Sequence, residues 1–120
     1  MTAVRVLLVD DVNEVRQNLR TALTLSGDIE VIGEAADGSE AVRLTESLQP
    51  DVVLMDLEMP VMDGYESTRQ IKSRFTTTVI ALTVHDYESA REKAKVAGVD
   101  AFLVKGAPVK TIVQTILKKE

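Results

Sequence analysis

Cysteine is absent from the 120-residue chain, so the protein can form neither disulfides nor thiolate metal sites. No stretch approaches the roughly 20 apolar residues that a membrane-spanning helix needs. The apolar run near the N-terminus is too short for a signal peptide, because it ends in Asp10 and Asp11. We therefore expect a cytoplasmic protein that makes no contact with membranes.

Basic charge is also scarce, since 14 Lys and Arg residues face 19 Asp and Glu residues and leave a net charge of −5. Nucleic acid backbones attract basic surfaces, so this balance argues against direct nucleic acid binding by this domain alone. The acidic excess favours a site that gathers carboxylates, such as a divalent cation site. The length fits one domain spanning residues 1–120, and 45% apolar residues suffice for its core.

Two kinds of segment alternate along the chain. Short runs rich in Val, Ile and Leu predict strands at residues 4–9, 29–35, 51–55, 79–82 and 101–104. The stretches between them have apolar residues at helical spacing and predict helices near residues 12–23, 41–48, 64–74, 87–97 and 109–117. The predicted pattern is (βα)5.

Residue types that often begin or end helices stand at the predicted boundaries. The candidates for helix starts are Asp11 with Glu14, Asp37 with Glu40, Asp63, Asp86 and, in the first turn of the last helix, Pro108. The candidates for helix ends are Gly27 and Gly98.

Alternating strands and helices predict an α/β fold with a doubly wound, parallel five-stranded sheet that is covered on both faces. The second strand carries Glu30 and Glu34, which are unsuited to a strand buried on both faces, so we expect it at an edge. An edge second strand fits the flavodoxin-like order 2-1-3-4-5, in which ligands bind beyond the carboxyl ends of strands 1 and 3.

Polar residues follow four of the five strands at their carboxyl ends: Asp10, Asp11, Asp56, Thr83 and Lys105. Taken singly, Asp11 is explained as a helix cap, Thr83 as a strand-end residue and Lys105 as a solvated cation. Asp56 lies between apolar neighbours, where a carboxylate needs a partner or a cation. The joint placement of the five predicts one shared cleft.

Three carboxylates in one cleft repel each other unless a cation compensates, and Mg²⁺ is a hard ion with oxygen ligands. We expect Asp11 and Asp56, with their acidic neighbour Asp10, to hold Mg²⁺. Lys105 adds a second positive charge, and Thr83 adds a hydroxyl donor. Such a site suits phosphoryl transfer to the Asp56 carboxylate as nucleophile.

Four segments of the sequence carry a resemblance to a known family: VLLVDD at 6–11, DVVLMDLEMPVMDG at 51–64, VIALT at 79–83 and AFLVKG at 101–106. The chain resembles the CheY-like receiver domain of bacterial two-component response regulators over nearly its whole length. The resemblance implies phosphorelay signalling, in which a sensor histidine kinase donates a phosphoryl group to Asp56. It implies a phosphoacceptor that assists its own phosphorylation and dephosphorylation rather than an enzyme.

The resemblance also assigns roles by position. It makes Asp11 the direct Mg²⁺ ligand of the acidic pair, and the backbone carbonyl of Glu58 a further ligand. It makes Thr83 the switch hydroxyl and Phe102 the switch aromatic residue. It makes Lys105 the lysine that pairs with the phosphoryl group.

Gly106 follows Lys105, where many receivers have proline, and this variant is similar to the NarL/FixJ branch. Full-length members of that branch usually carry a C-terminal helix-turn-helix, which implies a DNA-binding output domain and control of transcription. The switch would alter the surface of helix 4, strand 5 and helix 5. Exposure of Val109 and Val113 could support a homodimer on activation, but we expect both in the core.

Three other interpretations fit less well. A phosphohydrolase of the haloacid dehalogenase type needs a second Asp two positions after the nucleophile, and position 12 is Val. A flavodoxin-like cofactor module needs a glycine-rich loop after strand 1, which is missing. A pseudo-receiver that only binds partners is disfavoured by the full set of site residues.

We also expect Glu58 and His85 at the rim of the cleft, where they could control the access of water. An exposed loop histidine explains His85 slightly better.

Overall fold

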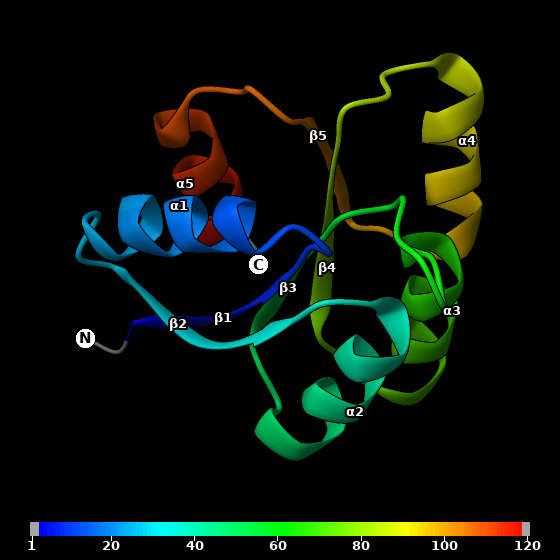
Figure 1. Cartoon of the computed structure of the whole chain (residues 1–120), viewed down its shortest axis with the longest axis horizontal. Helices are drawn as coiled ribbons and strands as arrows, with labels where there is room; N and C mark the ends of the chain where they lie inside the picture. The colour runs from blue at the N-terminus through cyan, green and yellow to red at the C-terminus, as the bar shows by residue number, and fades with distance from the viewer. Residues whose placement is uncertain (1–2, 119–120) are drawn as a thin grey trace.

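The computed structural model describes residues 3–118, in which strands and helices alternate as predicted (Figure 1). The strands are β1 (Val4–Val9), β2 (Ile29–Ala35), β3 (Val52–Met55), β4 (Thr78–Thr83) and β5 (Ala101–Val104). The helices are α1 (Asn13–Thr24), α2 (Gly38–Leu48), α3 (Gly64–Arg74), α4 (Glu88–Ala97) and α5 (Val109–Leu117).

The five strands form one parallel sheet in the order β2-β1-β3-β4-β5, which confirms the predicted doubly wound topology. β2 is an edge strand, as its two glutamates indicated. Met55 at the end of β3 lies opposite Val9 at the end of β1. The residues that follow these two strands are therefore neighbours.

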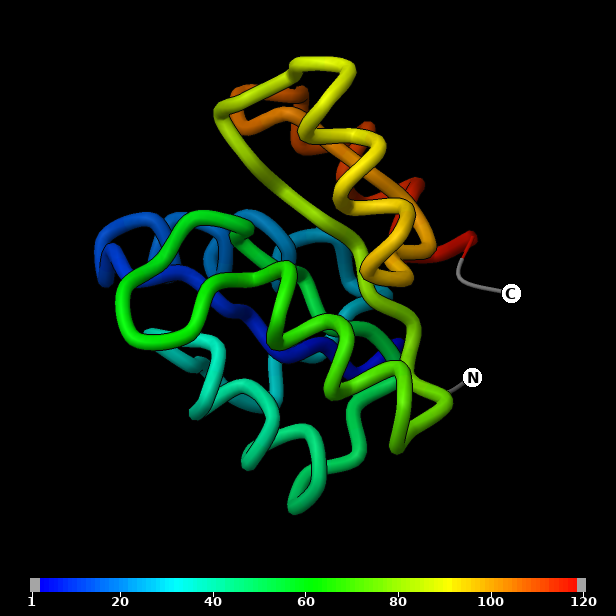
Figure 2. The backbone as a smooth tube through the Cα atoms, turned by 90° about the vertical axis from the view of Figure 1, so that its right-hand side faces the viewer, coloured from blue at the N-terminus to red at the C-terminus, as the bar shows by residue number. Residues whose placement is uncertain are grey.

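Helices cover both faces of the sheet, with α1 and α5 on one face and α2, α3 and α4 on the other (Figure 1). Alternate residues of β1 enter different cores: Leu7 and Val9 face α2 and α3, whereas Val6 and Leu8 face α1 and α5. α2 and α3 lie side by side in both views (Figures 1 and 2). Because both faces are covered, the central strands consist mostly of apolar residues, and β3 is apolar throughout.

Two of the four predicted caps are confirmed and two are wrong. Asp37 accepts from the N–H of Glu40 at the start of α2, and Asp63 accepts from the N–H of Glu66 at the start of α3. Asp11 does not cap α1, whose N-cap is Val12, and Asp86 does not cap α4, whose N-cap is Tyr87. Neither Val12 nor Tyr87 makes a side-chain cap bond.

The helix ends agree in part with the prediction. Gly98 ends α4 in the left-handed conformation, with a φ of 108° that favours glycine. α1 instead ends at Thr24, so Gly27 lies in the turn that follows. Pro108 is the N-cap of α5 rather than a residue of its first turn. Val109 is 46% exposed, so its predicted core position is wrong, whereas Val113 is partly buried against the core.

α4 buries only three small side chains, Ala90, Ala94 and Ala97, as the sequence pattern indicated. Burial of alanines stabilises a helix little, because each removes little apolar area from water. Within residues 3–118, no helix is long and apolar enough to cross a membrane.

Candidate phosphoryl-acceptor site

The carboxyl ends of β1 and β3 place Asp10 and Asp56 beside each other. The N–H of Asp56 donates to the carbonyl of Val9, and the N–H of Asp10 donates to the carbonyl of Ala35. These bonds extend the sheet ladder by one residue. Both aspartates are therefore fixed by the backbone, and both are buried, with exposed fractions of 3% for Asp10 and 5% for Asp56.

The start of α3 presses against the backbone of Asp56. The N–H of Gly64 donates to the carbonyl of Leu57 at 3.0 Å. A Cβ atom on Gly64 would lie 2.2 Å from the carbonyl oxygen of Asp56, closer than atoms can approach. Glycine at position 64 is therefore required for this contact, and the contact fixes the loop that follows Asp56.

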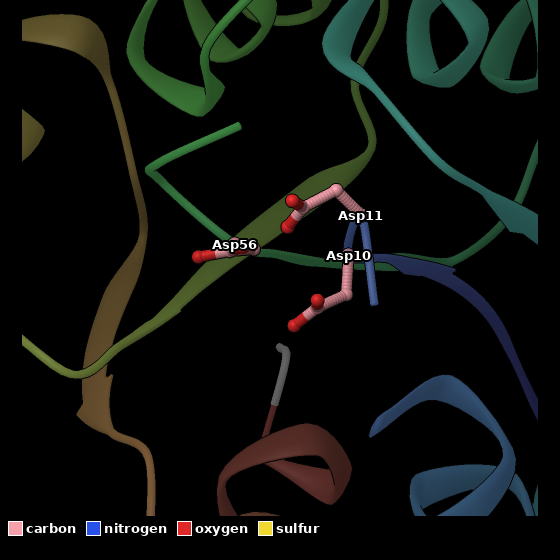
Figure 3. A group of neighbouring side chains, drawn as sticks. All are labelled: Asp10, Asp11 and Asp56. Atoms are coloured by element: carbon pink, nitrogen blue, oxygen red, sulfur yellow. The ribbon is translucent and has the colours of Figure 1, made fainter. Parts of the chain in front are cut away.

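Carboxylate oxygens of Asp10, Asp11 and Asp56 all lie within 4.8 Å of one another, and the three side chains converge in Figure 3. Asp11 is exposed, unlike the other two. Three convergent carboxylate oxygens with one side open to solvent fit Mg²⁺, which takes few carboxylates and keeps several waters. The carbonyl of Glu58 belongs to the adjacent loop, since the N–H of Glu58 donates to Asp56 Oδ1 at 3.3 Å.

Lys105 follows β5 and reaches both buried aspartates. Its Nζ lies 2.7 Å from Asp10 Oδ2 and 3.6 Å from Asp56 Oδ2. Burial alone would lower the pKa of Lys105, but its hydrogen bond to Asp10 and the nearby charges of Asp56 and Asp10 raise it overall. Lys105 is therefore a permanent cation, shared between two carboxylates rather than held by Asp56 alone.

Burial raises the pKa of Asp56 to about 6. The positive charge of Lys105 opposes this rise, and the negative charge of Asp10 adds to it. The Asp56 carboxylate is thus poorly neutralised by the protein itself. A second cation near Asp56 would favour its ionised, nucleophilic form.

Thr83 ends β4 and is buried, at 1% exposure. Its hydroxyl accepts from the N–H of His85 at 3.2 Å. His85 Nδ1 lies 2.6 Å from Glu58 Oε2, so the segment after β4 touches the loop after β3. The His85 ring also stacks on Tyr87, with 5.3 Å between the centroids. His85 lies in the loop between β4 and α4 with 34% of its side chain exposed, so it is a partly exposed loop residue in contact with Glu58.

Phe102 is partly buried in β5 and packs against the core on the α3 and α4 side of the sheet. The guanidinium of Arg91 in α4 lies 4.5 Å from the centre of its ring. Arg91 also pairs with Asp86, in the segment between β4 and α4. Arg91 of α4 therefore contacts both Phe102 in β5 and the segment between β4 and α4.

Two residues near the site were not predicted to belong to it, since Arg16 was not named and Glu34 was interpreted only as a sign of an edge strand. Arg16 in α1 donates to the backbone carbonyl of Asp10, and Glu34 in β2 binds the same guanidinium. One sequence signal was available, because Glu34 is one of two glutamates in β2, and Arg16 and Arg20 share one helix face four residues apart.

Comparisons with known proteins agree with this fold. The response regulator receiver domain family matches residues 6–117. The response regulator protein VraR of Staphylococcus aureus is 40% identical over 116 residues, which are 96% of this chain and 56% of VraR. The chain spans about half the length of VraR and of the Bacillus subtilis transcriptional regulatory protein YdfI, of which 53% is matched.

Solved structures are similar over almost the whole chain. The receiver domain of the putative response regulator NarL from Mycobacterium tuberculosis has a TM-score of 0.95 and 35% identity, with 98% of this chain and 96% of that chain covered. The family match and these likenesses cover the strands and helices that build the acidic cleft. The chain therefore belongs to the response regulator receiver domain family.

Proposed function

We propose that Asp56 accepts a phosphoryl group and that this modification switches the surface formed by α4, β5 and α5. The proposal rests on one observation: three carboxylates converge within 4.8 Å, with the ammonium group of Lys105 beside two of them. Phosphoryl transfer needs positioning and charge neutralisation around a nucleophile more than it needs covalent help from the protein.

In the proposed transfer, a carboxylate oxygen of Asp56 attacks the phosphorus of the donor. The new bond is the oxygen–phosphorus bond of an acyl phosphate. The bond that breaks joins phosphorus to the histidine nitrogen of the kinase, or to the acyl oxygen of a small donor such as acetyl phosphate. The leaving group keeps the electron pair of that bond, and no oxidant or reductant is needed.

Asp11, Asp56 and the carbonyl of Glu58 would hold Mg²⁺, with Asp10 beside them. When bound, this ion supplies the positive charge that offsets the carboxylates and the incoming phosphoryl oxygens. Lys105 stabilises charge on the other side, where it already lies 3.6 Å from Asp56. Thr83 would donate its hydroxyl to a phosphoryl oxygen.

The partners follow from the family. We propose that a sensor histidine kinase is the physiological donor, that the chain acts in the cytoplasm, and that residues 1–120 work as one receiver domain. The matched relatives are longer than this chain and include transcriptional regulators. A C-terminal DNA-binding domain in the full-length protein would then receive the signal.

Mass spectrometry tests the acceptor. The protein is incubated with acetyl phosphate and Mg²⁺, and we expect a gain of one phosphoryl group in the wild type. The gain should vanish in Asp56→Asn and in the presence of a chelator. Asp37→Asn is a matched control, because the Asp37 carboxylate caps α2 and is not one of the three convergent carboxylates. A gain that persists in Asp56→Asn would place the chemistry on another residue.

The switch is proposed to run from Thr83 to Phe102. If the Thr83 hydroxyl turned toward the phosphoryl group, the space that it left would let the Phe102 ring rotate inward. Arg91, which lies over that ring, would move with α4. Thr83→Ala should then uncouple phosphorylation from the change at α4, as measured by amide hydrogen exchange. An unaltered exchange response in Thr83→Ala would contradict this part of the proposal.

Glu58 and His85 are proposed to set the lifetime of the phosphoryl group. They touch across the rim of the cleft at 2.6 Å, where together they could exclude attacking water. We expect His85→Ala and Glu58→Ala each to raise the dephosphorylation rate by a factor of a few. Equal dephosphorylation rates in the wild type and in both variants would contradict this part of the proposal.

A further inference from the structure

Arg16 ties the loop that carries the acidic pair to the edge of the sheet. Its Nη1 donates to the backbone carbonyl of Asp10 at 2.5 Å, and its Nε donates to Glu34 Oε1 at 2.9 Å. The Arg16 side chain is 13% exposed, so most of it is shielded from water. Charge-assisted bonds at a partly buried position are stronger and less screened than those at the surface.

Glu34 holds Arg16 in place from the other side. One Glu34 oxygen accepts from Arg16 and Gln17, and the other accepts from Arg20 at 2.8 Å. Burial alone would raise the pKa of Glu34, but the hydrogen bonds from Arg20, Arg16 and Gln17 lower it overall. Glu34 is therefore a fixed anion on β2, which limits where the Arg16 guanidinium can lie.

The Asp11 carboxylate depends on its backbone for its position. Within residues 3–118, no hydrogen bond or ion pair from another side chain engages that carboxylate, and Asp11 is exposed. α1 begins just after it without a side-chain cap. The peptide bond that leads into Asp11 carries the Asp10 carbonyl, which is the group that Arg16 binds. Fixing this carbonyl fixes the plane from which the Asp11 side chain extends.

We propose that Arg16, anchored by Glu34, is a positioning residue for the Mg²⁺ site: it holds the Asp10–Asp11 peptide so that Asp11 meets Asp10 and Asp56. Arg16 acts through the backbone and touches neither the ion nor the phosphoryl group. The inference rests on the proposed function, because it assumes that the three carboxylates bind Mg²⁺. The inference makes Mg²⁺ binding depend on residues of α1 and β2, although neither element contributes a metal ligand.

Arg20 offers a matched control for the experiment. Like Arg16, it lies in α1 and donates from Nε to Glu34, but its other contact is the carbonyl of Val31 rather than that of Asp10. Arg16→Met and Arg20→Met each remove one ion pair with Glu34 and keep the length of the side chain. Only the first change releases the metal-ligand loop.

The first measurement is the dissociation constant for Mg²⁺, followed through backbone amide chemical shifts without any phosphodonor. We expect Arg16→Met to bind Mg²⁺ about tenfold more weakly, the usual scale for residues that orient metal ligands, and Arg20→Met to match the wild type. Arg16→Lys should remain weak, because one ammonium group cannot reproduce the planar fork that spans both oxygens. Glu34→Gln should weaken Mg²⁺ binding less than Arg16→Met does.

The rate of phosphorylation by acetyl phosphate supplies a second readout. A positioning role predicts a defect in Arg16→Met at low Mg²⁺ that shrinks as Mg²⁺ is raised. Equal Mg²⁺ affinities in Arg16→Met and Arg20→Met would overturn the inference while leaving the proposed function intact. Absence of Mg²⁺ binding in the wild type would overturn both. If circular dichroism shows that Arg16→Met is unfolded, the Mg²⁺ affinity of Glu34→Gln tests the inference instead. A wild-type Mg²⁺ affinity in Glu34→Gln would then overturn the inference.

Discussion

The helices α2 and α3 begin differently from α1 and α4. Asp37 and Asp63 cap α2 and α3, each by accepting a backbone N–H three residues later at 2.9 Å. α1 and α4 have Val12 and Tyr87 at the same position, with no side-chain cap. Asp10 stands before α1 and Asp86 before α4, but the carboxylates of these two aspartates have other partners.

At α1, Asp10 directs one oxygen to the N–H of Val12 and the other to Lys105. At α4, Asp86 pairs with Arg91, which also lies over Phe102. The carboxylates of Asp10 and Asp86 therefore do not cap these helices, because Asp10 binds Lys105 and Asp86 binds Arg91. The first turns of α1 and α4 therefore lack the side-chain cap bond that opposes local opening at the starts of α2 and α3.

Gly64→Ala has the largest expected effect, and it tests the start of α3, one of the two capped helices. An added Cβ would lie 2.2 Å from the Asp56 carbonyl oxygen and 2.7 Å from the Cα of Leu57. Overpacking against rigid backbone should lower the free energy of unfolding by about 3 kcal/mol or more. Urea denaturation followed by circular dichroism measures it. Ser73→Ala, on the exposed side of the same helix, should change it by less than about 0.5 kcal/mol.

Asp56→Asn tests whether the site itself costs stability. The native pKa of Asp56, about 6, exceeds its ordinary value of 3.8, so the folded state holds this proton more tightly than the unfolded state. That contribution to stability is complete below about pH 4 and is lost as the pH rises through about 6. Without Mg²⁺, Asp56→Asn should therefore be more stable than the wild type at pH 7.5, by up to about 3 kcal/mol.

The same denaturation experiment at several pH values checks this prediction. The difference between variant and wild type should grow between about pH 4 and pH 6 and then level off. Saturating Mg²⁺ should reduce it, because the ion binds the native wild-type site. A wild type that is more stable than Asp56→Asn at pH 7.5 without Mg²⁺ would show that Lys105 already neutralises the carboxylate.

A comparison of Asp63→Ala with Asp11→Ala tests the helix caps. Asp63 is a confirmed cap, whereas Asp11 was predicted to cap α1 and does not. Loss of the bond from Asp63 to the N–H of Glu66 should lower the free energy of unfolding by about 1 kcal/mol. Asp11→Ala should cause no such loss in Mg²⁺-free buffer, because Asp11 caps nothing and its removal relieves repulsion in the acidic cluster. Equal losses in the two variants would contradict the distinction between the helix starts.

Tyr87→Ser should have the smallest effect, because it adds a cap where α4 lacks one. The backbone at Tyr87 is extended, with φ of −95° and ψ of 155°, as a capping serine requires. We expect a gain of about 0.5 kcal/mol and slower amide exchange in the first turn of α4. Asp37→Ser is the control, since it exchanges one capping residue for another. Faster exchange in α4 would mean that stacking of Tyr87 on His85 matters more than capping.

Local pattern predicted the strands and helices closely and the helix starts poorly. Three strands, β1, β2 and β5, have the predicted bounds, because their apolar runs end sharply at charged or small residues. An Asp followed three residues later by Glu occurs at Asp11, Asp37 and Asp63, yet only Asp37 and Asp63 cap helices. The pattern is the same at all three positions, and only the surroundings differ.

The sequence by itself determined the alternation of strands and helices, the edge position of β2, and the edge of the sheet at which Asp10, Asp56 and Lys105 gather. It could do so because parallel strands bring their carboxyl ends to one side, whatever the details of packing. These properties depend on residue type and spacing alone.

Only the tertiary structure decided how those groups share their charges. It paired Lys105 more closely with Asp10 than with Asp56, raised the pKa of Asp56, and joined Arg16 and Glu34 to the Asp10 carbonyl. Each of these outcomes depends on burial and on distances of a few ångströms between segments far apart in the sequence. Electrostatic energies and hydrogen bonds vary steeply over such distances, so packing of the helices against the sheet sets them.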